Sequence, residues 1–448
     1  MHPLQRTPLG RATAIVLMAV ACALLAGCTG TSRSQVEVQA PTTNPKAPPT
    51  TRVPDCAEVL PPSAQAGQLL MVMVTAPGLA KDAIDTGTAG GFGLKGRQSE
   101  DVGAQIKDTV AAAPIKAFVA SDEEGGSVQR FEAALGKLPS AATLAKGTPE
   151  EAGTIIGDYS KKMVELGVDM NFAPVADVGS GSDLGTRSFG DDPVEVARFV
   201  TASIKAQQQA GLIPVVKHWP GIGGGTTDPH DSLDVIGSLA ELAQKDMVPF
   251  NAAFQAGVPA VMVAHAEVPG LTAENEPASL SAAAITEQLK GKDKFTGLVI
   301  TDSLGMGAVI DKYSQDEAAE KAILAGADIA LVSGADVVPV AHARLTDAIT
   351  TGRIPQARVI DAVRKVLSTK GIKGECPDLV ASVASAQQGL SKTGDTETTT
   401  GSGSQTGTGT AGNTGSGTST GSDDSNTGSA NSTGSGVGQR DTGINDTP

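Results

Sequence analysis

Histidine and cysteine are scarce in this sequence of 448 residues, and the few present are not spaced for a metal ion. The five histidines include no His-Glu-Xaa-Xaa-His motif, and the four cysteines show no zinc-type spacing. We therefore expect no metal site and no bound cofactor.

Other motifs with a defined chemistry are also missing. The glycines within 221–225 follow neither the P-loop nor the dinucleotide-binding order, and no Gly-Xaa-Ser-Xaa-Gly elbow is present. The formal net charge of −15 argues against a nucleic-acid partner. Carboxylates and imidazoles remain as the candidate catalytic groups.

Long apolar runs are absent after residue 28, so no later segment is expected to span a membrane. Residues 1–28 read as an export signal, with Arg6 and Arg11 ahead of a short apolar core. The signal ends in LAGC, which resembles the lipobox of bacterial lipoproteins. It predicts that Cys28 carries a lipid and that the protein is anchored at the extracytoplasmic face of the cell membrane. A plain cleaved signal or a short anchor are the alternatives.

The rest of the chain divides by composition. Residues 29–54 are rich in Thr, Pro and Ser and are typical of a tether, and residues 385–448 form a Gly/Ser/Thr-rich tail with too little apolar surface to fold. The tail is a spacer or has no specific role. Residues 55–380 suffice for one large catalytic domain.

Two cysteines bracket that domain. Cys22 leaves with the signal and Cys28 carries lipid, so Cys56 and Cys376 are expected to pair in an oxidising compartment. The sequence does not decide the oligomeric state, although a monomer is the simplest expectation.

Eight short apolar runs alternate with segments of helical character. The runs are 69–74, 90–94, 117–120, 169–174, 213–216, 260–264, 298–301 and 329–332. Runs that are apolar on both faces are typical of parallel strands buried between helices. Eight such units predict an α/β fold, a single (β/α)8 TIM-type barrel, with a doubly wound sheet as the alternative.

Polar residues follow five of these runs directly. They are Asp122-Glu123-Glu124, Asp177, Lys217-His218, His265 and Asp302-Ser303. In a barrel these carboxyl ends share one face, where active sites lie. Any one of these residues could be a structural cap, but five together predict a pocket.

Four motifs resemble those of the bacterial β-N-acetylhexosaminidases in glycoside hydrolase family 3. KHWPGIGGGTTDPH is similar to their Lys-His-Phe-Pro-Gly…Asp-Ser-His signature, and SDEEGGSVQR to their Asp-Gln-Glu-Gly-Gly-Arg-Val-Gln-Arg. GTRSFG is similar to Gly-Xaa-Arg-Ser-Phe-Gly, and VITDSLGMGAV to the strand that carries the nucleophile. The four motifs lie in the family's order and span essentially all of residues 65–370.

The resemblance implies a role for eight residues. It makes Asp302 the nucleophile and His230 the general acid/base with Asp228 as its partner. It makes sugar-binding residues of Asp122, Arg130, Arg187, Lys217 and His218. The sequence departs from the pattern at Glu123 (Gln in the family), Ser127 (Arg), Trp219 (Phe) and Ile222 (His). Glu123 adds a carboxylate beside the sugar pocket and leaves the charge of that pocket open.

The residues support these roles independently. Asp302 ends a buried strand, where a nucleophile is held rigidly, although an Asp there also suits a helix N-cap. Pro229 favours an extended Asp228, whose carboxylate would then face the ring of His230, since residues two apart in an extended chain project alike. The alternative is an Asp-Pro turn with a solvated His.

The glycines after His218 are expected to let the loop swing His230 over a substrate. Arg130 and Arg187 suit sugar contacts or barrel-closing ion pairs. Trp219 is expected to pack under the loop, with sugar stacking as the alternative.

The function expected is a retaining exo-β-N-acetylglucosaminidase that acts on glycans such as peptidoglycan fragments, without metal, cofactor or nucleic acid. Alternatives are a β-glucosidase or a phosphorylase of the same family, and a non-catalytic wall-binding lipoprotein. β-Glucosidases usually take their acid from a Glu in a second domain, for which this length leaves no room.

Overall fold

The computed structural model describes residues 55–181, 184–373, 376 and 379–386. The predicted export signal, the lipidation site Cys28, the tether and almost all of the predicted tail therefore lie outside the described residues. Within the described part of the chain, no helix is long and apolar enough to cross a membrane.

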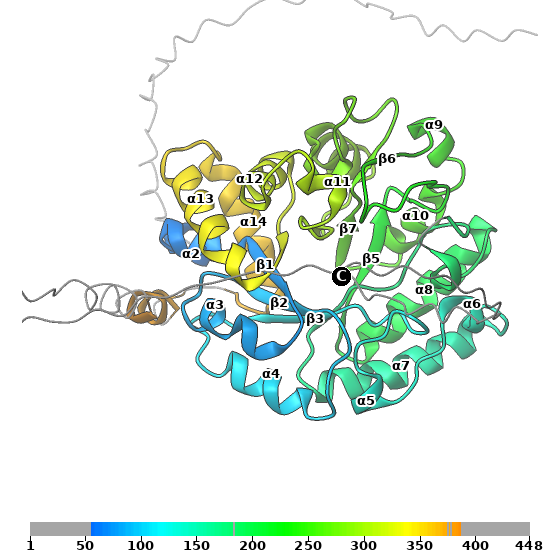
Figure 1. Ribbon diagram of the computed structural model, residues 1–448, viewed down its shortest axis with the longest axis horizontal. Helices are drawn as coiled ribbons and strands as arrows, with labels where there is room; N and C mark the ends of the chain where they lie inside the picture. Colours follow the sequence, from blue (N-terminus) through cyan, green and yellow to red (C-terminus); the bar gives the residue numbers. More distant parts are fainter. Residues whose placement is uncertain (1–54, 182–183, 374–375, 377–378, 387–448) are drawn as a thin grey trace, which may run out of the picture. The chain divides into compact units, whose positions relative to one another are not determined.

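Eight parallel strands form the centre of the fold (Figure 1). They are β1 (Leu70–Val74), β2 (Gly91–Leu94), β3 (Phe118–Ser121), β4 (Met170–Asn171), β5 (Ile213–Trp219), β7 (Ala260–Val263), β9 (Leu298–Thr301) and β10 (Ala330–Ser333). The sheet order is β10-β1-β2-β3-β4-β5-β7-β9, and a parallel bridge between Ile300 and Ile329 joins its two ends. The predicted barrel is confirmed, and each strand overlaps one of the eight predicted runs.

Two strands differ in length from the expectation. Strand β4 ends at Asn171, before the end of the predicted run 169–174. Strand β5 continues through Lys217 and His218 to Trp219. The Lys-His pair is therefore part of a buried strand and does not merely follow one.

The helices surround the strands (Figure 1). The α-helices are α1 (Cys56–Val59), α2 (Pro62–Gln68), α3 (Lys81–Asp85), α4 (Val102–Val110), α5 (Glu132–Leu135), α6 (Ala141–Leu144), α7 (Pro149–Glu165), α8 (Pro193–Gln209), α9 (Leu239–Leu242), α10 (Met247–Gln255), α11 (Gly307–Ile310), α12 (Gln315–Ala325), α13 (Val338–Thr350) and α14 (Gln356–Thr369). A π-helix spans Ala283–Lys292, and short 3-10 turns cover Pro77–Ala80, Gly185–Arg187, Ala278–Leu280 and Ala335–Val337.

Local sequence explains why the long helices start where they do. Helix α7 begins after Thr148, whose side chain and that of Glu151 form a reciprocal capping box, and Asp192 caps α8. Proline is the first residue of both helices, where its missing N–H is not needed.

The barrel has two apolar layers. Alternate strand residues fill its interior, among them Met71, Phe118, Met170, Met262 and Ile300. The other strand residues face the helices and join a larger cluster outside the barrel. Because both faces of every strand are buried, polar side chains gather at the strand ends. The candidate site therefore lies at the strand ends.

A disulfide joins the two ends of the barrel domain. Cys56 in α1 pairs with Cys376, beyond α14, and their Cα atoms lie 5.4 Å apart. This confirms the predicted pairing. A second parallel pair, β6 (Asp234–Val235) and β8 (Ala266–Glu267), lies beside the carboxyl ends of the main strands.

Candidate active site

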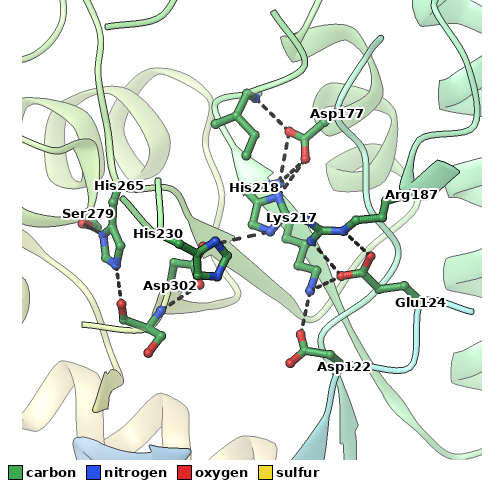
Figure 2. A network of polar contacts seen from close by, with 12 residues as sticks. Asp122, Glu124, Asp177, Arg187, Lys217, His218, His230, His265, Ser279 and Asp302 are labelled. Atoms are coloured by element: carbon green, nitrogen blue, oxygen red, sulfur yellow. Dashed lines mark hydrogen bonds and ion pairs between the residues drawn. The ribbon is translucent and has the colours of Figure 1, made fainter. Parts of the chain in front are cut away.

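The predicted site residues gather at the carboxyl ends of β3, β5 and β9 and on the loops that follow (Figure 2). Lys217 and His218 come from β5, Asp122 follows β3, and Asp302 follows β9. The structure brings all eight residues within 4.0 Å of a charged or imidazole partner in the site, and the longest of these contacts are Arg130–Asp122 at 3.9 Å and His218–Asp302 at 4.0 Å.

Lys217 is the centre of a buried ion-pair cluster (Figure 2). Its ammonium Nζ lies 2.7 Å from Asp122 Oδ1 and 2.6 Å from Glu124 Oε1, and its side chain is 3% exposed. Burial alone would lower the pKa of Lys217, but the carboxylates of Asp122 and Glu124 raise it above the usual value. The ammonium therefore stays charged at the floor of the site.

Arg187 reaches the same cluster from a 3-10 turn far along the chain. Its Nε lies 2.7 Å and its Nη2 2.9 Å from the two carboxylate oxygens of Glu124, a bidentate pair. Burial opposes ionisation of Glu124, yet Arg187 and Lys217 hold the pKa of this carboxyl far below its usual range. The ion-pair alternative for Arg187 is thus observed, with Glu124 as its partner.

His218 is held by a carboxylate from the end of β4. Its Nδ1 lies 2.7 Å from Asp177 Oδ2, and Asp177 also accepts from the backbone N–H of Ile222 at 2.9 Å. Because the Asp177 carboxylate accepts the Nδ1 proton, the Nε2 atom of His218 takes no part in this hydrogen bond. That Nε2 lies 4.0 Å from Asp302 Oδ2.

Asp302 is partly buried at the end of β9, with 18% of its side chain exposed. Burial raises the pKa of Asp302, but His218, His265 and Lys217 together outweigh it, so this pKa lies below the usual value. Its Oδ1 accepts the N–H of Ser303 at 2.7 Å, and helix α11 starts only at Gly307. Asp302 is therefore an ionised, accessible carboxylate and not the cap of that helix.

His230 and Asp228 pair as predicted, but through a different backbone shape. His230 Nδ1 lies 2.8 Å from Asp228 Oδ1, which also accepts the backbone N–H of His230 at 2.8 Å. The carbonyl of Asp228 accepts from Asp231 N, so the segment is a turn. The expected extended geometry was wrong, because an Asx-type turn brings the two side chains together. The Nε2 of His230 is left for proton transfer.

The loop that carries His230 is fixed at several points. The N–H groups of Gly307 and Ala308 at the start of α11 donate to the carbonyls of His230 and Pro229. Asp234 Oδ2 accepts the backbone N–H groups of Thr226 and Thr227 at 2.9 and 3.2 Å. These contacts connect the loop directly to the segment after Asp302.

Close backbone approach gives the glycines of this loop a structural reason. A Cβ on Gly223 would lie 2.1 Å from the carbonyl oxygen of Val178, and Gly221 has φ +120°. Neither position accepts a larger residue without a shift of the backbone. Whether the loop also swings, as the sequence led us to expect, stays a prediction.

Glu123 does not face the sugar pocket. Its Oε1 accepts the backbone N–H groups of Arg130 and Phe131, the latter at 2.7 Å, and its Oε2 accepts from Tyr159 Oη at 3.2 Å. The residue is 2% exposed, and burial raises its pKa to about 7. Glu123 therefore does not contribute to the charge of the sugar pocket. Its carboxyl group instead holds the backbone of Arg130 in place.

Three contributors to the site were not given a role from the sequence: Asp177, Glu124 and His265. Each of them follows a predicted strand, and this position was the only feature of the sequence that indicated a place in the site. His265 is 1% exposed, its Nε2 lies 2.8 Å from the Ser303 carbonyl, and its Nδ1 lies 2.6 Å from Ser279 Oγ. Burial lowers the pKa of His265, and its Nε2–H donates to the Ser303 carbonyl, which positions the turn after Asp302.

Trp219 packs under the loop as expected. It is fully buried, so it offers no surface on which a sugar could stack. Within the described residues, no group of three or more His, Cys, Asp or Glu side chains could hold a metal ion.

Comparison with known proteins supports the resemblance. Residues 63–369 match the glycosyl hydrolase family 3 N terminal domain. The chain is 35% identical over 385 residues to the beta-hexosaminidase LpqI of Mycobacterium tuberculosis, covering 81% of this chain and 98% of that protein.

Solved structures agree with these sequence matches. A glycosyl hydrolase of the GH3 family from Mycobacterium smegmatis has a TM-score of 0.66 at 35% identity, covering 71% of this chain and 98% of that one. A GH3 beta-N-acetylglucosaminidase from Paenibacillus sp. has a TM-score of 0.65 at 29% identity, covering 72% and 68%.

The barrel and the carboxylate–imidazole cluster at its mouth define a glycoside hydrolase. More particularly, because the family match spans most of the barrel domain, the chain belongs to glycosyl hydrolase family 3.

Proposed function

We propose that the protein is a retaining exo-β-N-acetylglucosaminidase that releases terminal β-linked N-acetylglucosamine through a covalent intermediate on Asp302. The observation that carries this proposal is the presence of two unlike groups at the mouth, on segments joined by the hydrogen bond from Gly307 N–H to the His230 carbonyl. Asp302 is an accessible carboxylate with a lowered pKa, and His230 is an imidazole whose Nδ1 is fixed by Asp228. Retaining hydrolysis requires a nucleophile and a proton donor of this kind.

In the first step, a carboxylate oxygen of Asp302 attacks the anomeric carbon and the bond to the leaving oxygen breaks. His230 in its protonated form gives the Nε2 proton to that oxygen, while Asp228 stabilises the imidazolium. In the second step, neutral His230 takes a proton from water, the water oxygen bonds to the anomeric carbon, and Asp302 is released. A free imidazole titrates at about 6.5, which makes histidine a suitable residue type for giving and taking a proton near neutral pH.

The remaining polar residues suit recognition of the terminal sugar. Lys217, Asp122 and Arg187 form a cluster fixed by ion pairs, and its remaining donor and acceptor capacity fits sugar hydroxyls. His218 lies between this cluster and Asp302, and Arg130 lies on the other side of Asp122. We assign all five residues to substrate binding.

The names of the relatives guide the choice of sugar. LpqI is described as a beta-hexosaminidase and the Paenibacillus protein as a beta-N-acetylglucosaminidase. We extend that activity to this chain and propose cell-wall fragments as its natural substrate, reached from a lipid anchor on Cys28. Cys28→Ala should then move the protein from the membrane to the medium, and unchanged detergent partitioning would contradict the anchor.

A release assay tests the sugar and the reaction together. Aryl β-N-acetylglucosaminide and aryl β-glucoside are compared, each with and without inorganic phosphate. We expect preferential release from the first substrate with free N-acetylglucosamine as product. Preferential cleavage of the glucoside favours a β-glucosidase, a sugar 1-phosphate product favours a phosphorylase, and no release favours a non-catalytic role.

A further inference from the structure

The barrel closes between β9 and β10, where an isolated parallel bridge joins Ile300 to Ile329. In the described part of the chain, no strand pairing between β9 and β10 continues past this bridge. The backbone after β9 turns towards β7 instead, since the N–H of Asp302 donates to the Val263 carbonyl at 3.0 Å. Strand β10 continues to Ser333, so its edge beside the nucleophile needs other hydrogen-bond partners.

Groups outside the ladder take the place of the missing strand along this edge. The N–H of Leu331 donates to Thr301 Oγ1 at 3.0 Å, and the Leu331 carbonyl accepts the N–H of Leu304 at 2.8 Å. Two residues further on, Gln315 binds both backbone groups of Ser333. Its Oε1 accepts the Ser333 N–H at 2.7 Å, and its Nε2 donates to the Ser333 carbonyl at 3.0 Å. The side-chain amide of Gln315 thus completes the edge of β10 as a neighbouring strand would.

The contact between Gln315 and Ser333 supports the turn that follows the nucleophile. This turn is closed by the N–H of Met306, which donates to the Ser303 carbonyl at 3.1 Å, and Gly305 lies within it. A Cβ on Gly305 would lie 2.7 Å from Ser333 Cβ and 3.5 Å from both Nε2 and Oε1 of Gln315. Gly305 therefore packs directly against the amide of Gln315.

The same turn leads to the segment that holds the acid/base residue. It is followed by α11, whose first residue, Gly307, donates to the His230 carbonyl at 3.0 Å. Asp302 is fixed separately, because its own N–H is bonded to β7. A shift of the turn would therefore move His230 relative to Asp302. Catalysis is sensitive to such a shift, since the nucleophile and the proton donor must both reach the substrate in one geometry.

We propose that Gln315 is a positioning residue of the reaction, whose amide sets the distance between Asp302 and His230. It acts through its contacts with Ser333 and Gly305. The inference rests on the proposed function for the roles of Asp302 and His230. A residue with this role should change the relative rates of different substrates, and not only the amount of folded enzyme.

Steady-state kinetics of the full chain with Gln315→Met test the role, because this change removes both hydrogen bonds at a similar side-chain length. Two aryl β-N-acetylglucosaminides are compared, one whose leaving group has a low pKa and one whose leaving group has a high pKa. We expect kcat/KM for the second to fall roughly 10–100-fold, the loss from a displacement of about 1 Å. The loss for the first should be several-fold smaller, because its leaving group needs little protonation. An unchanged ratio of the two values would overturn the proposal.

The ratio of the two kcat/KM values does not depend on the fraction of enzyme that is folded, so partial unfolding cannot imitate the effect. Gln356→Met is the matched control, because this exposed glutamine begins α14 as Gln315 begins α12. The control should keep the wild-type ratio, and a change as large as that in Gln315→Met would contradict the proposal. Absence of release from both glycosides by the wild-type protein would instead contradict the proposed function.

Gln315→Glu tests the two-point contact with Ser333. A neutral carboxyl group has one acceptor and one donor, as the amide does, but a carboxylate has no donor for the Ser333 carbonyl. A glutamate titrates at about 4.3, so the ratio for this variant should return towards the wild-type ratio at the same pH as the pH falls from about 7 to about 4. A displaced ratio that does not change with pH would contradict the part assigned to the amide donor.

Discussion

Asp302 and His230 lie in different surroundings at the mouth of the barrel. Asp302 lies near two imidazoles and the Lys217 ammonium, which lower its pKa despite burial. His230 is half-exposed on a loop, where Asp228 fixes one ring nitrogen. One group is thus kept ready to attack and the other free to exchange a proton, the division of labour that retaining hydrolysis requires.

Glu123 gives a stability prediction at this scale. Burial raises the pKa of Glu123 from 4.5 to about 7. The contribution of the neutral carboxyl group to the free energy of unfolding is therefore fully present below pH 4.5 and is lost as the pH rises through 7. Glu123→Gln keeps an acceptor for the Arg130 and Phe131 N–H groups without the charge. At pH 8 the free energy of unfolding of Glu123→Gln should therefore exceed that of the wild type by at most about 3 kcal/mol.

Denaturant unfolding at pH 4.5 and pH 8 checks this expectation. The two proteins should differ little at the lower pH, where the wild-type carboxyl is already neutral. A difference in unfolding free energy that is the same at both values would mean that Glu123 does not titrate between them.

Sequence distance decided which site residues could be predicted. The Asp228–His230 pair is two residues apart, so local sequence was enough to pair them, although it gave the wrong backbone shape. Asp177, in the segment after β4, and His218, in β5, are 41 residues apart. Only the register of β4 against β5 brings those side chains together, and no local pattern reports that register.

At the scale of elements, the site depends on how the loop after β5 sits on the start of α11. The carbonyls of His230 and Pro229 accept hydrogen bonds from α11, five and six residues after Asp302. The acid/base residue is therefore positioned by the same segment that follows the nucleophile. The apolar runs predicted the strands well, because burial on both faces leaves a clear pattern, but this loop contact has no such pattern.

Gly307→Ala tests that contact. A Cβ at 307 would lie 2.5 Å from the carbonyl oxygens of His230 and Asp231, so the loop must move. A displacement of about 1 Å should lower kcat roughly 10–100-fold. Gly224→Ala is the matched control on the loop itself, since a Cβ there meets no heavy atom within 4 Å. Steady-state kinetics should show a loss in the first variant only, and equal effects would contradict the contact.

At the scale of the whole barrel domain, the disulfide closes the chain at the end of the barrel away from the site. Helix α1 precedes β1 and the Cys376 segment follows α14, so both lie towards the amino ends of the strands. Ion pairs from Arg364 to Asp55 and Glu58 hold the same two segments together. The disulfide thus reinforces contacts that exist without it.

Removing the disulfide should affect stability and not chemistry. The chain-entropy model gives about 6 kcal/mol for a sequence separation of 320 residues, and we expect about 2 kcal/mol because the ends are already held. Cys56→Ser with Cys376→Ser should lower the unfolding free energy by that amount and leave kcat unchanged at 25 °C. Two freely alkylated thiols in the unreduced wild-type protein would contradict the pairing.

In the proposed mechanism, Asp302 carries the sugar while His230 transfers the proton. Intact-mass measurement of His230→Ala after mixing with an aryl β-N-acetylglucosaminide whose leaving group has a low pKa tests it most directly. Such a group leaves without protonation, but hydrolysis then lacks its base. We expect an adduct of one sugar on Asp302 that accumulates, disappears with azide, and is absent from the double variant with Asp302→Ala. A His230→Ala variant that turns over activated and unactivated substrates like wild type, without an adduct, would contradict it.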